Sequence, residues 1–478
     1  MIQNKIQNKK YDVIIVGSGP AGISLATNLN KNFNIALLES GLKNYSPKHQ
    51  NTYKGELTGE FPRESHISRL KMFGGTTGHW GGTCRPLDEY DFNLWPIKKK
   101  NLDPYLDKAT KILEIKNQFR EMLFPNTENL KLIEFQVSKI RFREKYYDKI
   151  KKSKNIDLYL DATFIKMAGD NKIFKKAVIN YSGKNSEMSG KCIVFAAGGI
   201  ENSRILLLED LENNKKLFNK GLPIGNYWFE HPFKELGKAI TDEKKISKRL
   251  DNSFNHFVNM FNAGDKAMTY SVAPTERFIN KNKILNSCIW IVLHRRSYSD
   301  WKNITKNLLC ISPNFSEKLL KFLDRKISCG TTMYSSWEQE PERDNRIVLS
   351  NKLKDEFLRP SSKIIYKKSK LVRGTARKFI QEIAKYYLNE DIGRVSAYTF
   401  LFNKEKYISD AGWHHMGGTR MGTDPKLSVV DRNLRIFGSQ NIYVAGSSVF
   451  PSGGHANPTI TIIQLSLRLA EHLNNKII

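Results

Sequence analysis

Three glycines near the N-terminus have the spacing of a phosphate-binding turn. Gly17, Gly19 and Gly22 form a G-x-G-x-x-G pattern directly after an apolar, β-branched run at residues 12–16. In this pattern the first glycine allows a tight turn, the second lets the backbone approach a pyrophosphate, and the third lets a helix pack closely on the strand. Glu39 follows at the end of the next apolar run, where an acidic side chain can bind ribose hydroxyls. The stretch predicts a dinucleotide site without deciding between FAD and NAD.

Two glycine-rich stretches near the C-terminus carry polar side chains that suit acid–base chemistry. Removing the proton of a hydroxyl group requires a base, and the oxyanion that forms requires a donor that holds it. Imidazole suits the base because its pKa lies near neutral pH. The first stretch, WHHMGGTRMG, offers His415 and its neighbour His414, and the second, GHANPT, offers His455 and Asn457. Asn457 and Pro458 also predict a helix start, with asparagine as the N-cap and proline at the first helical position.

A third glycine-rich stretch, residues 71–86, has five glycines within nine positions, Gly75 among them. Such density is costly in backbone entropy, so we expect the chain to lie flat against a ligand here. His79 and Trp80 stand in the middle of the stretch.

A second turn repeats the strand–glycine–helix order of the N-terminal motif. The run KCIVFAA at residues 191–197 predicts a buried strand, and Gly198 and Gly199 lead from it into a helix at residues 201–208. Near the C-terminus, residues 441–445 predict another strand, which ends at Ala445 and Gly446.

Together these stretches resemble the glucose–methanol–choline (GMC) family of FAD-dependent oxidoreductases, and in motif they are closest to the pyranose oxidase-like members. The resemblance implies that FAD is the cofactor and that the stretch AAGGIENSR returns the chain to it. It also implies that NYWFEHPF, residues 226–233, lies near the flavin. A hydrogen bond in the turn before Pro232 is the favoured role for His231.

The resemblance also implies roles for single residues. His79 matches the histidine that in some relatives bonds covalently to the 8α-carbon of the flavin; a noncovalent contact with the flavin is the alternative. His415 matches the catalytic histidine, and Asn457 matches a partner position that holds histidine or asparagine. The resemblance thus implies oxidation of a CH–OH group, with proton abstraction and hydride transfer to flavin N5.

The predicted fold class is α/β: an FAD-binding Rossmann-like domain with an inserted substrate domain made of a β-sheet and helices. Hairpin strands are expected at residues 156–181, a loop over the cofactor at 42–65, and helical or mixed segments at 103–114 and 128–147. Further strands are predicted at 269–275, 287–293 and 331–337, and a helix at 371–387. The predicted FAD-binding domain comprises residues 1–90, 155–235 and 410–478, and the substrate domain with connecting helices comprises 91–154 and 236–409.

The composition narrows the protein class. The 77 Lys and Arg against 48 Asp and Glu give a net charge of +29, but the lysines are scattered, which favours a solvated surface over a nucleic-acid or membrane partner. The five cysteines form no C-x-x-C, which argues against an iron–sulfur cluster, a zinc site or a disulfide framework. There is neither an N-terminal signal region nor an apolar run of membrane-spanning length, so we expect a cytoplasmic protein.

The expected partners are a small alcohol or sugar and an electron acceptor that could be oxygen, a quinone or a separate subunit. Two alternatives stay open. One is a non-redox lyase on the same fold, like the hydroxynitrile lyases. The other is a basic nucleic-acid-binding protein with a vestigial flavin site, for which the sequence offers no recognised motif.

Overall fold

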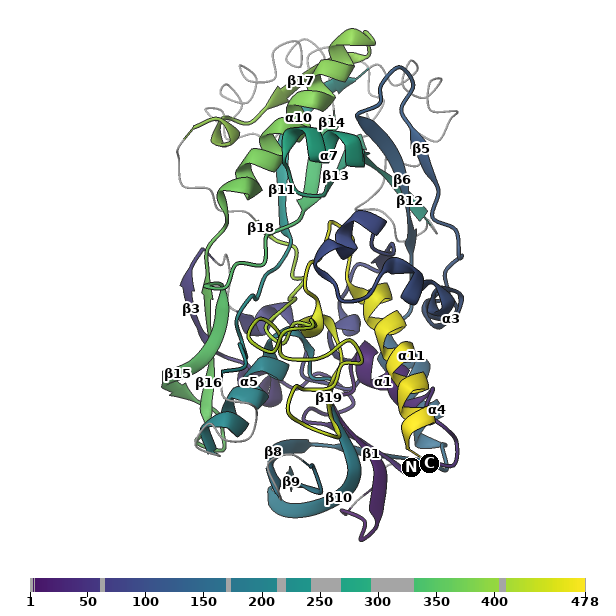
Figure 1. The fold of residues 1–478 in the computed structure, drawn as a ribbon, viewed down its shortest axis with the longest axis vertical. Helices are drawn as coiled ribbons and strands as arrows, with labels where there is room; N and C mark the ends of the chain where they lie inside the picture. Colours follow the sequence, from purple (N-terminus) through teal and green to yellow (C-terminus); the bar gives the residue numbers. More distant parts are fainter. Residues whose placement is uncertain are drawn as a thin grey trace, which may run out of the picture.

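The computed structural model describes residues 3, 5–60, 65–168, 173–212, 221–241, 268–293, 331–403 and 410–477. Figure 1 shows a lower and an upper part of the molecule: β1, β8–β10 and α11 lie in the lower part of the view, and α10, β13 and β14 lie in the upper part. Both chain termini lie together at the lower end (Figure 1). This arrangement confirms the predicted mixed α/β fold.

The lower part is built on a seven-stranded sheet whose centre is parallel. β1 pairs in parallel with β2 on one side and β10 on the other, so that Val13 lies beside both Ile35 and Cys192. Its strands are β1 (Lys10–Val16), β2 (Ile35–Glu39), β7 (Ile156–Leu160), β8 (Ala162–Ala168), β9 (Lys176–Tyr181), β10 (Lys184–Phe195) and β19 (Ile442–Val444). Strands β1, β2 and the end of β10 are almost wholly buried, as expected for an apolar run covered on both faces.

The helices around this sheet come from distant parts of the sequence. Helix α1 follows the glycine turn and packs against α11, and α4 contacts β7. These helices are α1 (Pro20–Ala26), α3 (Leu106–Leu113), α4 (Phe142–Lys151), α5 (Gly198–Glu212) and α11 (Thr459–Lys476). Helix α1 begins directly after Gly19 and ends at Ala26.

The upper part holds a nine-stranded, largely antiparallel sheet covered by α10 (Figure 1). Its strands are β4 (Thr83–Cys84), β5 (Glu121–Leu123), β6 (Leu130–Val137), β11 (Pro232–Thr241), β12 (Met268–Pro274), β13 (Ser287–Leu293), β14 (Thr331–Trp337), β17 (Gly393–Ala397) and β18 (Asp410–Ala411). The helices of this part are α7 (Glu276–Asn282) and α10 (Lys370–Asn389). The strands predicted at 269–275, 287–293 and 331–337 and the helix predicted at 371–387 are confirmed.

A three-stranded sheet of β3 (Glu56–Gly59), β15 (Arg346–Lys354) and β16 (Pro360–Tyr366) packs against α5. Strand β3, together with α2 (Pro47–Asn51), replaces the loop predicted at residues 42–65. Its partner β16 lies about three hundred residues away, with Leu57 beside Ile364, so local sequence gave no sign of the pairing. Short 3-10 helices fill several connections: η1 (Ser65–Ser68), η2 (Gly75–Gly78), η3 (Glu89–Leu94), η4 (Lys99–Asn101), η5 (Asp103–Tyr105), η7 (Thr399–Leu401) and η8 (Ser447–Val449).

The segment 128–147, predicted to be helical or mixed, is mixed: it is mainly the strand β6, which pairs with β12, followed by the start of α4. One other local prediction needs correction. Helix α11 begins at Thr459 with Pro458 as its N-cap, one residue later than predicted, so Asn457 does not cap the helix. The division into two domains remains a prediction. Strands β4 and β18 fall in the predicted FAD-binding segments and pair in the nine-stranded sheet.

Candidate functional site

A cavity of about 520 Å³ lies at the carboxyl ends of β1, β2 and β10. This volume falls within the usual range for small-molecule sites. The edge of a parallel sheet where strand order reverses is also the expected place for a ligand. The cavity is lined by residues from the N-terminal glycine turn, the loop at 67–82, the β10–α5 turn, the β15–β16 connection and the C-terminal segment. The cavity therefore brings together the glycine-rich and histidine-containing stretches for which the sequence predicted a role in binding or catalysis.

The glycine turn has the geometry that its sequence predicted. Gly17 has a φ of 108°, and a Cβ there would lie 2.5 Å from the carbonyl oxygen of Ala196. At Gly22 a Cβ would lie 1.9 Å from the Gly17 oxygen, so a side chain would separate helix and strand. Gly19 instead faces open space and lines the cavity. The turn thus leaves a cradle that would fit the phosphates of a dinucleotide.

Glu39 is buried at the end of β2 and lines the cavity. Its Oε2 accepts hydrogen bonds from the backbone nitrogen of Ser18 at 3.2 Å and from the Ser18 hydroxyl at 2.6 Å. Its Oε1 accepts from the Gly41 nitrogen at 2.8 Å. The carboxylate therefore ties the glycine turn to the end of the second strand, and its predicted contact with a ribose remains a prediction.

The glycine-rich loop covers one wall of the cavity. Gly75 has a φ of 56° and approaches Gly19 so closely that a Cβ would lie 3.0 Å from the Gly19 Cα. Trp80 donates from Nε1 to the Ile140 oxygen at 3.0 Å, which anchors the loop. His79 and Trp80 both line the cavity, and the loop lies over the glycine turn; its expected contact with a ligand remains a prediction.

The second glycine turn leads from β10 into α5 and packs against the C-terminal segment. Gly198 has a φ of 90° and faces open space, whereas a Cβ at Gly199 would lie 2.1 Å from the His415 oxygen. Asn202 ties this turn to the C-terminal segment: its Oδ1 accepts from Ala197 N at 2.8 Å and its Nδ2 donates to Ala445 O at 3.0 Å. Asn202 lies in the stretch AAGGIENSR, but nothing in that stretch predicted its role.

His415 is buried in the cavity wall. Its Nε2 lies 2.7 Å from the Ser68 hydroxyl, and its ring stacks on Trp228 with centroids 5.7 Å apart. Burial, and then the positive charge of Arg69, lower the pKa of His415 to about 3. The imidazole is therefore neutral at physiological pH, which is the form that can accept a proton.

The structure brings the Asn457 side chain within hydrogen-bond distance of His414. Nδ2 of Asn457 lies 3.0 Å from Nε2 of His414, whose Nδ1 lies 2.9 Å from Nδ1 of His231. Both His414 and His415 line the cavity, as do Asn457 and Pro458. The predicted roles of His415 and Asn457 remain predictions, and the geometry adds His414 and His231 to the site. His455 is buried outside the cavity lining, with Nδ1 4.0 Å from the Asp88 carboxylate.

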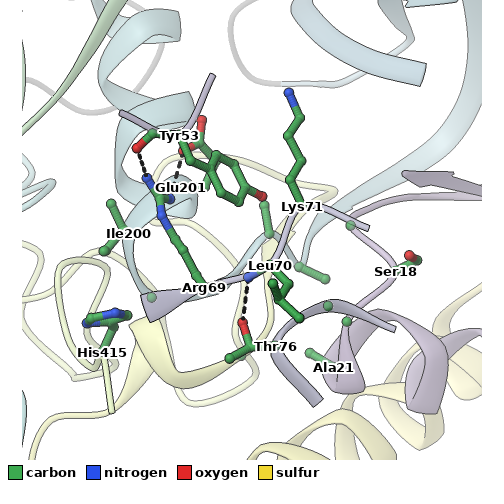
Figure 2. A pocket seen from close by; sticks show the side chains of 18 of the residues that line it. Ser18, Ala21, Tyr53, Arg69, Leu70, Lys71, Thr76, Ile200, Glu201 and His415 are labelled. Atoms are coloured by element: carbon green, nitrogen blue, oxygen red, sulfur yellow. Dashed lines mark hydrogen bonds and ion pairs between the residues drawn. The ribbon is translucent and has the colours of Figure 1, made fainter. Parts of the chain in front are cut away.

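A buried ion-pair network, which no sequence motif indicated, lines the same wall of the cavity as His415. Arg69 pairs with Glu201 at 3.1 Å, and Arg204 bridges Glu201 and Asp355 at 2.6 Å each. Figure 2 shows Arg69 and Tyr53 close to Glu201, with His415 further along the same wall. Burial alone would raise the pKa of Glu201, but Arg204 and Arg69 outweigh it and hold the pKa at about 2. The network fixes this wall, and no local motif could have revealed it.

Glu230, next to His231, is completely buried, and neither carboxyl oxygen has a hydrogen-bond partner within the described ranges. Burial raises its pKa to about 8. The folded protein therefore keeps a proton on Glu230 that the unfolded chain releases above about pH 4.5. The contribution of Glu230 to the free energy of unfolding therefore falls as the pH rises from about 4.5 to 8.

We expect Glu230→Gln to be more stabilising at pH 8 than at pH 5. Between pH 5 and pH 8, about three pH units, the stabilisation by the substitution should grow by about 4 kcal/mol, because each unit of pKa shift is worth about 1.4 kcal/mol. The measurement is the free energy of unfolding of both proteins in denaturant at each pH. An equal difference at pH 5 and pH 8 would contradict the buried, protonated state.

Residues 341–466 match the family model of GMC oxidoreductases. The chain is 27% identical to the fructose dehydrogenase large subunit of Gluconobacter japonicus over 60% of this chain and 47% of that protein. It is 22% identical to 2-methyl-1,2-propanediol dehydrogenase of Mycolicibacterium austroafricanum, over 62% and 50%, and 28% identical to pyranose 2-oxidase of Lyophyllum shimeji, over 28% and 21%. The alignments thus span about half the length of the first two relatives.

Two solved structures share the fold over nearly the whole chain. Pyridoxine 4-oxidase from Mesorbium loti is 13% identical, with a TM-score of 0.59 over 97% of this chain and 99% of that one. Formate oxidase of Aspergillus oryzae, in a variant studied for FAD modification, is 12% identical, with a TM-score of 0.56 over 99% of both chains. Within the described ranges, no helix combines the length and apolarity that crossing a membrane requires.

Proposed function

We propose that this chain, whose residues 341–466 match the family model of GMC oxidoreductases, uses FAD to oxidise a CH–OH group of an alcohol or sugar. The observation that carries the proposal is one cavity that joins a dinucleotide turn to a wall of neutral histidines and an asparagine. The named relatives are oxidases or dehydrogenases, two of them of sugars. Their names support the class of substrate.

The residues of the cavity fit FAD. Gly19 and Gly198 face open space where phosphate oxygens would approach the backbone, and Glu39 lies where ribose hydroxyls would bind. Gly75 and Trp80 would cover the cofactor from the glycine-rich loop, and Gly446 and Pro458 would border it from the C-terminal segment. Ala445 directly precedes Gly446 and is not among the residues that line the cavity. When bound, FAD supplies the acceptor for the hydride that leaves the substrate carbon.

The protein's own residues would handle the substrate oxygen. His415 is the proposed base, because its imidazole is neutral and lines the cavity. Asn457 is the proposed donor that holds the oxygen as negative charge develops on it. Oxygen, a quinone or a separate subunit would reoxidise the cofactor.

The test is anaerobic mixing of the purified yellow protein with a panel of sugars and alcohols, followed by the loss of flavin absorbance. The proposal expects one FAD per chain and bleaching by at least one member of the panel. Binding of NAD without flavin would contradict the cofactor. Flavin binding with no bleaching, together with cleavage of a cyanohydrin, would favour the lyase alternative.

We further propose that His79 is the point of covalent attachment to FAD. It lies in the loop that packs over the glycine turn and borders the cavity. After acid precipitation, the yellow colour should stay in the pellet of the wild-type protein, and His79→Ala should release it to the supernatant. His472→Ala, in helix α11 and outside the cavity lining, is the control and should keep a yellow pellet. A colourless wild-type pellet would remove the covalent link but leave FAD binding intact.

A further inference from the structure

A chain of hydrogen bonds leads from a backbone carbonyl to Asn457. Nε2 of His231 lies 3.3 Å from the Gly453 oxygen, and its Nδ1 lies 2.9 Å from Nδ1 of His414. Nε2 of His414 then lies 3.0 Å from Nδ2 of Asn457. His231 is fully buried at one end, whereas Asn457 borders the cavity at the other.

The backbone holds the two histidines together. His231 precedes β11, and β11 pairs with β18 immediately before Gly412. The Gly412 nitrogen donates to the His231 oxygen at 2.9 Å. A Cβ at Gly412 would lie 2.9 Å from that oxygen and 3.4 Å from the His414 Nδ1. The contact between the two rings is therefore a feature of strand pairing and a close backbone approach.

The carbonyl end of the chain fixes the direction of every hydrogen bond. A carbonyl oxygen only accepts, so His231 carries its proton on Nε2, and its Nδ1 must accept when the ring is neutral. His414 then has to donate from Nδ1, which leaves its Nε2 as an acceptor. Burial lowers the pKa of His231 to about 4 and that of His414 well below its ordinary value, so both rings are neutral.

The geometry points to His231 and His414 as positioning residues that make Asn457 present its amide nitrogen, and so its second N–H, to the substrate oxygen. The opposite amide orientation would require a proton on Nε2 of His414. Neither of the two facing Nδ1 atoms would then carry a proton, so the neutral rings of His231 and His414 could not form a hydrogen bond with each other. This inference rests on the proposed function of the cavity, but the orientation itself is a property of the protein alone.

The inference separates the roles of the two adjacent histidines. Nε2 of His414 is occupied by the amide of Asn457, so His414 orients the donor, and the base remains His415. A glutamine at position 414 could accept from Asn457 through its side-chain oxygen but could not act as a base. A leucine of similar size could do neither, so the two substitutions distinguish orientation from proton abstraction.

The first measurement needs no substrate. In protein labelled with ¹⁵N in histidine, nitrogen chemical shifts distinguish protonated from unprotonated ring nitrogens, and single variants assign His231 and His414 among the ten histidines. We expect a proton on Nδ1 of His414 and on Nε2 of His231. His231→Asn, whose amide oxygen can still accept, should keep the His414 tautomer, and His231→Phe should lose it. A proton on Nε2 of His414 in the wild type would overturn the inference.

The second measurement is the anaerobic rate of flavin reduction. His414→Leu should slow it by roughly 10²–10³-fold, the usual cost of losing one donor to a developing oxyanion. His414→Gln should restore the rate to within about tenfold of the wild type, with FAD content normal in both variants. A His414→Gln protein as slow as His414→Leu would overturn the inference and make His414 the base. If no alcohol or sugar reduces the wild type, the proposed function fails while the tautomer measurement still decides the orientation.

Discussion

His415→Ala should slow reduction of the bound flavin by a competent alcohol or sugar by roughly 10²–10⁴-fold, the usual cost of losing a general base. The variant should bind FAD normally, because the wild-type imidazole hydrogen-bonds to Ser68 and stacks on Trp228 in the cavity wall. With a pKa of about 3 the imidazole is already unprotonated at physiological pH, although the same low pKa makes it a weak base in the free protein.

The measurement is stopped-flow reduction under anaerobic conditions, with FAD content determined from the absorbance of each preparation. His472→Ala, in helix α11, should reduce at the wild-type rate. Reduction of His415→Ala at full speed would contradict the assignment and move the base to His414 or His455.

Asn457→Ala should slow the same step by about 10²–10³-fold, because the oxygen that becomes negative loses a donor. Asn457→Asp should be at least as slow, since a carboxylate repels the developing charge. The loss should fall on the rate of reduction at saturating substrate, because the donor acts in the transition state.

The structure supplies a control for this second result. Asn457 makes no cap on α11, so neither substitution should lower stability by the roughly 1 kcal/mol typical of a lost N-cap. Thermal unfolding of the FAD-free proteins measures this directly. A wild-type reduction rate in Asn457→Ala would exclude the residue as the donor, and a marked drop in melting temperature would mean that the side chain supports the helix.

Local sequence was enough to locate the cofactor cradle. Gly17, Gly22 and Gly199 face backbone atoms that leave no room for a side chain, and a requirement of this kind fixes the residue type at its own position. Strands β1, β2 and β10 could be predicted for a related reason, since strands buried on both faces must be continuous apolar runs.

The contacts among the polar side chains of the cavity could not be predicted from local sequence. His414 and His415 are adjacent and chemically identical, and only the path of the backbone decides which one meets Asn457. Trp413 has a φ of 61°, an uncommon conformation for a large side chain, directly before the pair. The contacts of Arg69 and His231 likewise join residues more than a hundred positions apart, and no local spacing reports such distances.

The place of β19 at the side of β10 has a consequence for how the protein is made. Ile442 lies beside Ile193, so the sheet that begins with β1 is completed only by the last strand in the chain. A ribosome adding about 5–20 residues per second needs roughly 20–90 s to travel from β1 to β19. During that time the apolar strands have an open edge, and parallel pairing between distant segments is itself slow. The nascent chain therefore needs protection from aggregation, by chaperones or by early packing of the upper sheet, before it can form its cofactor site.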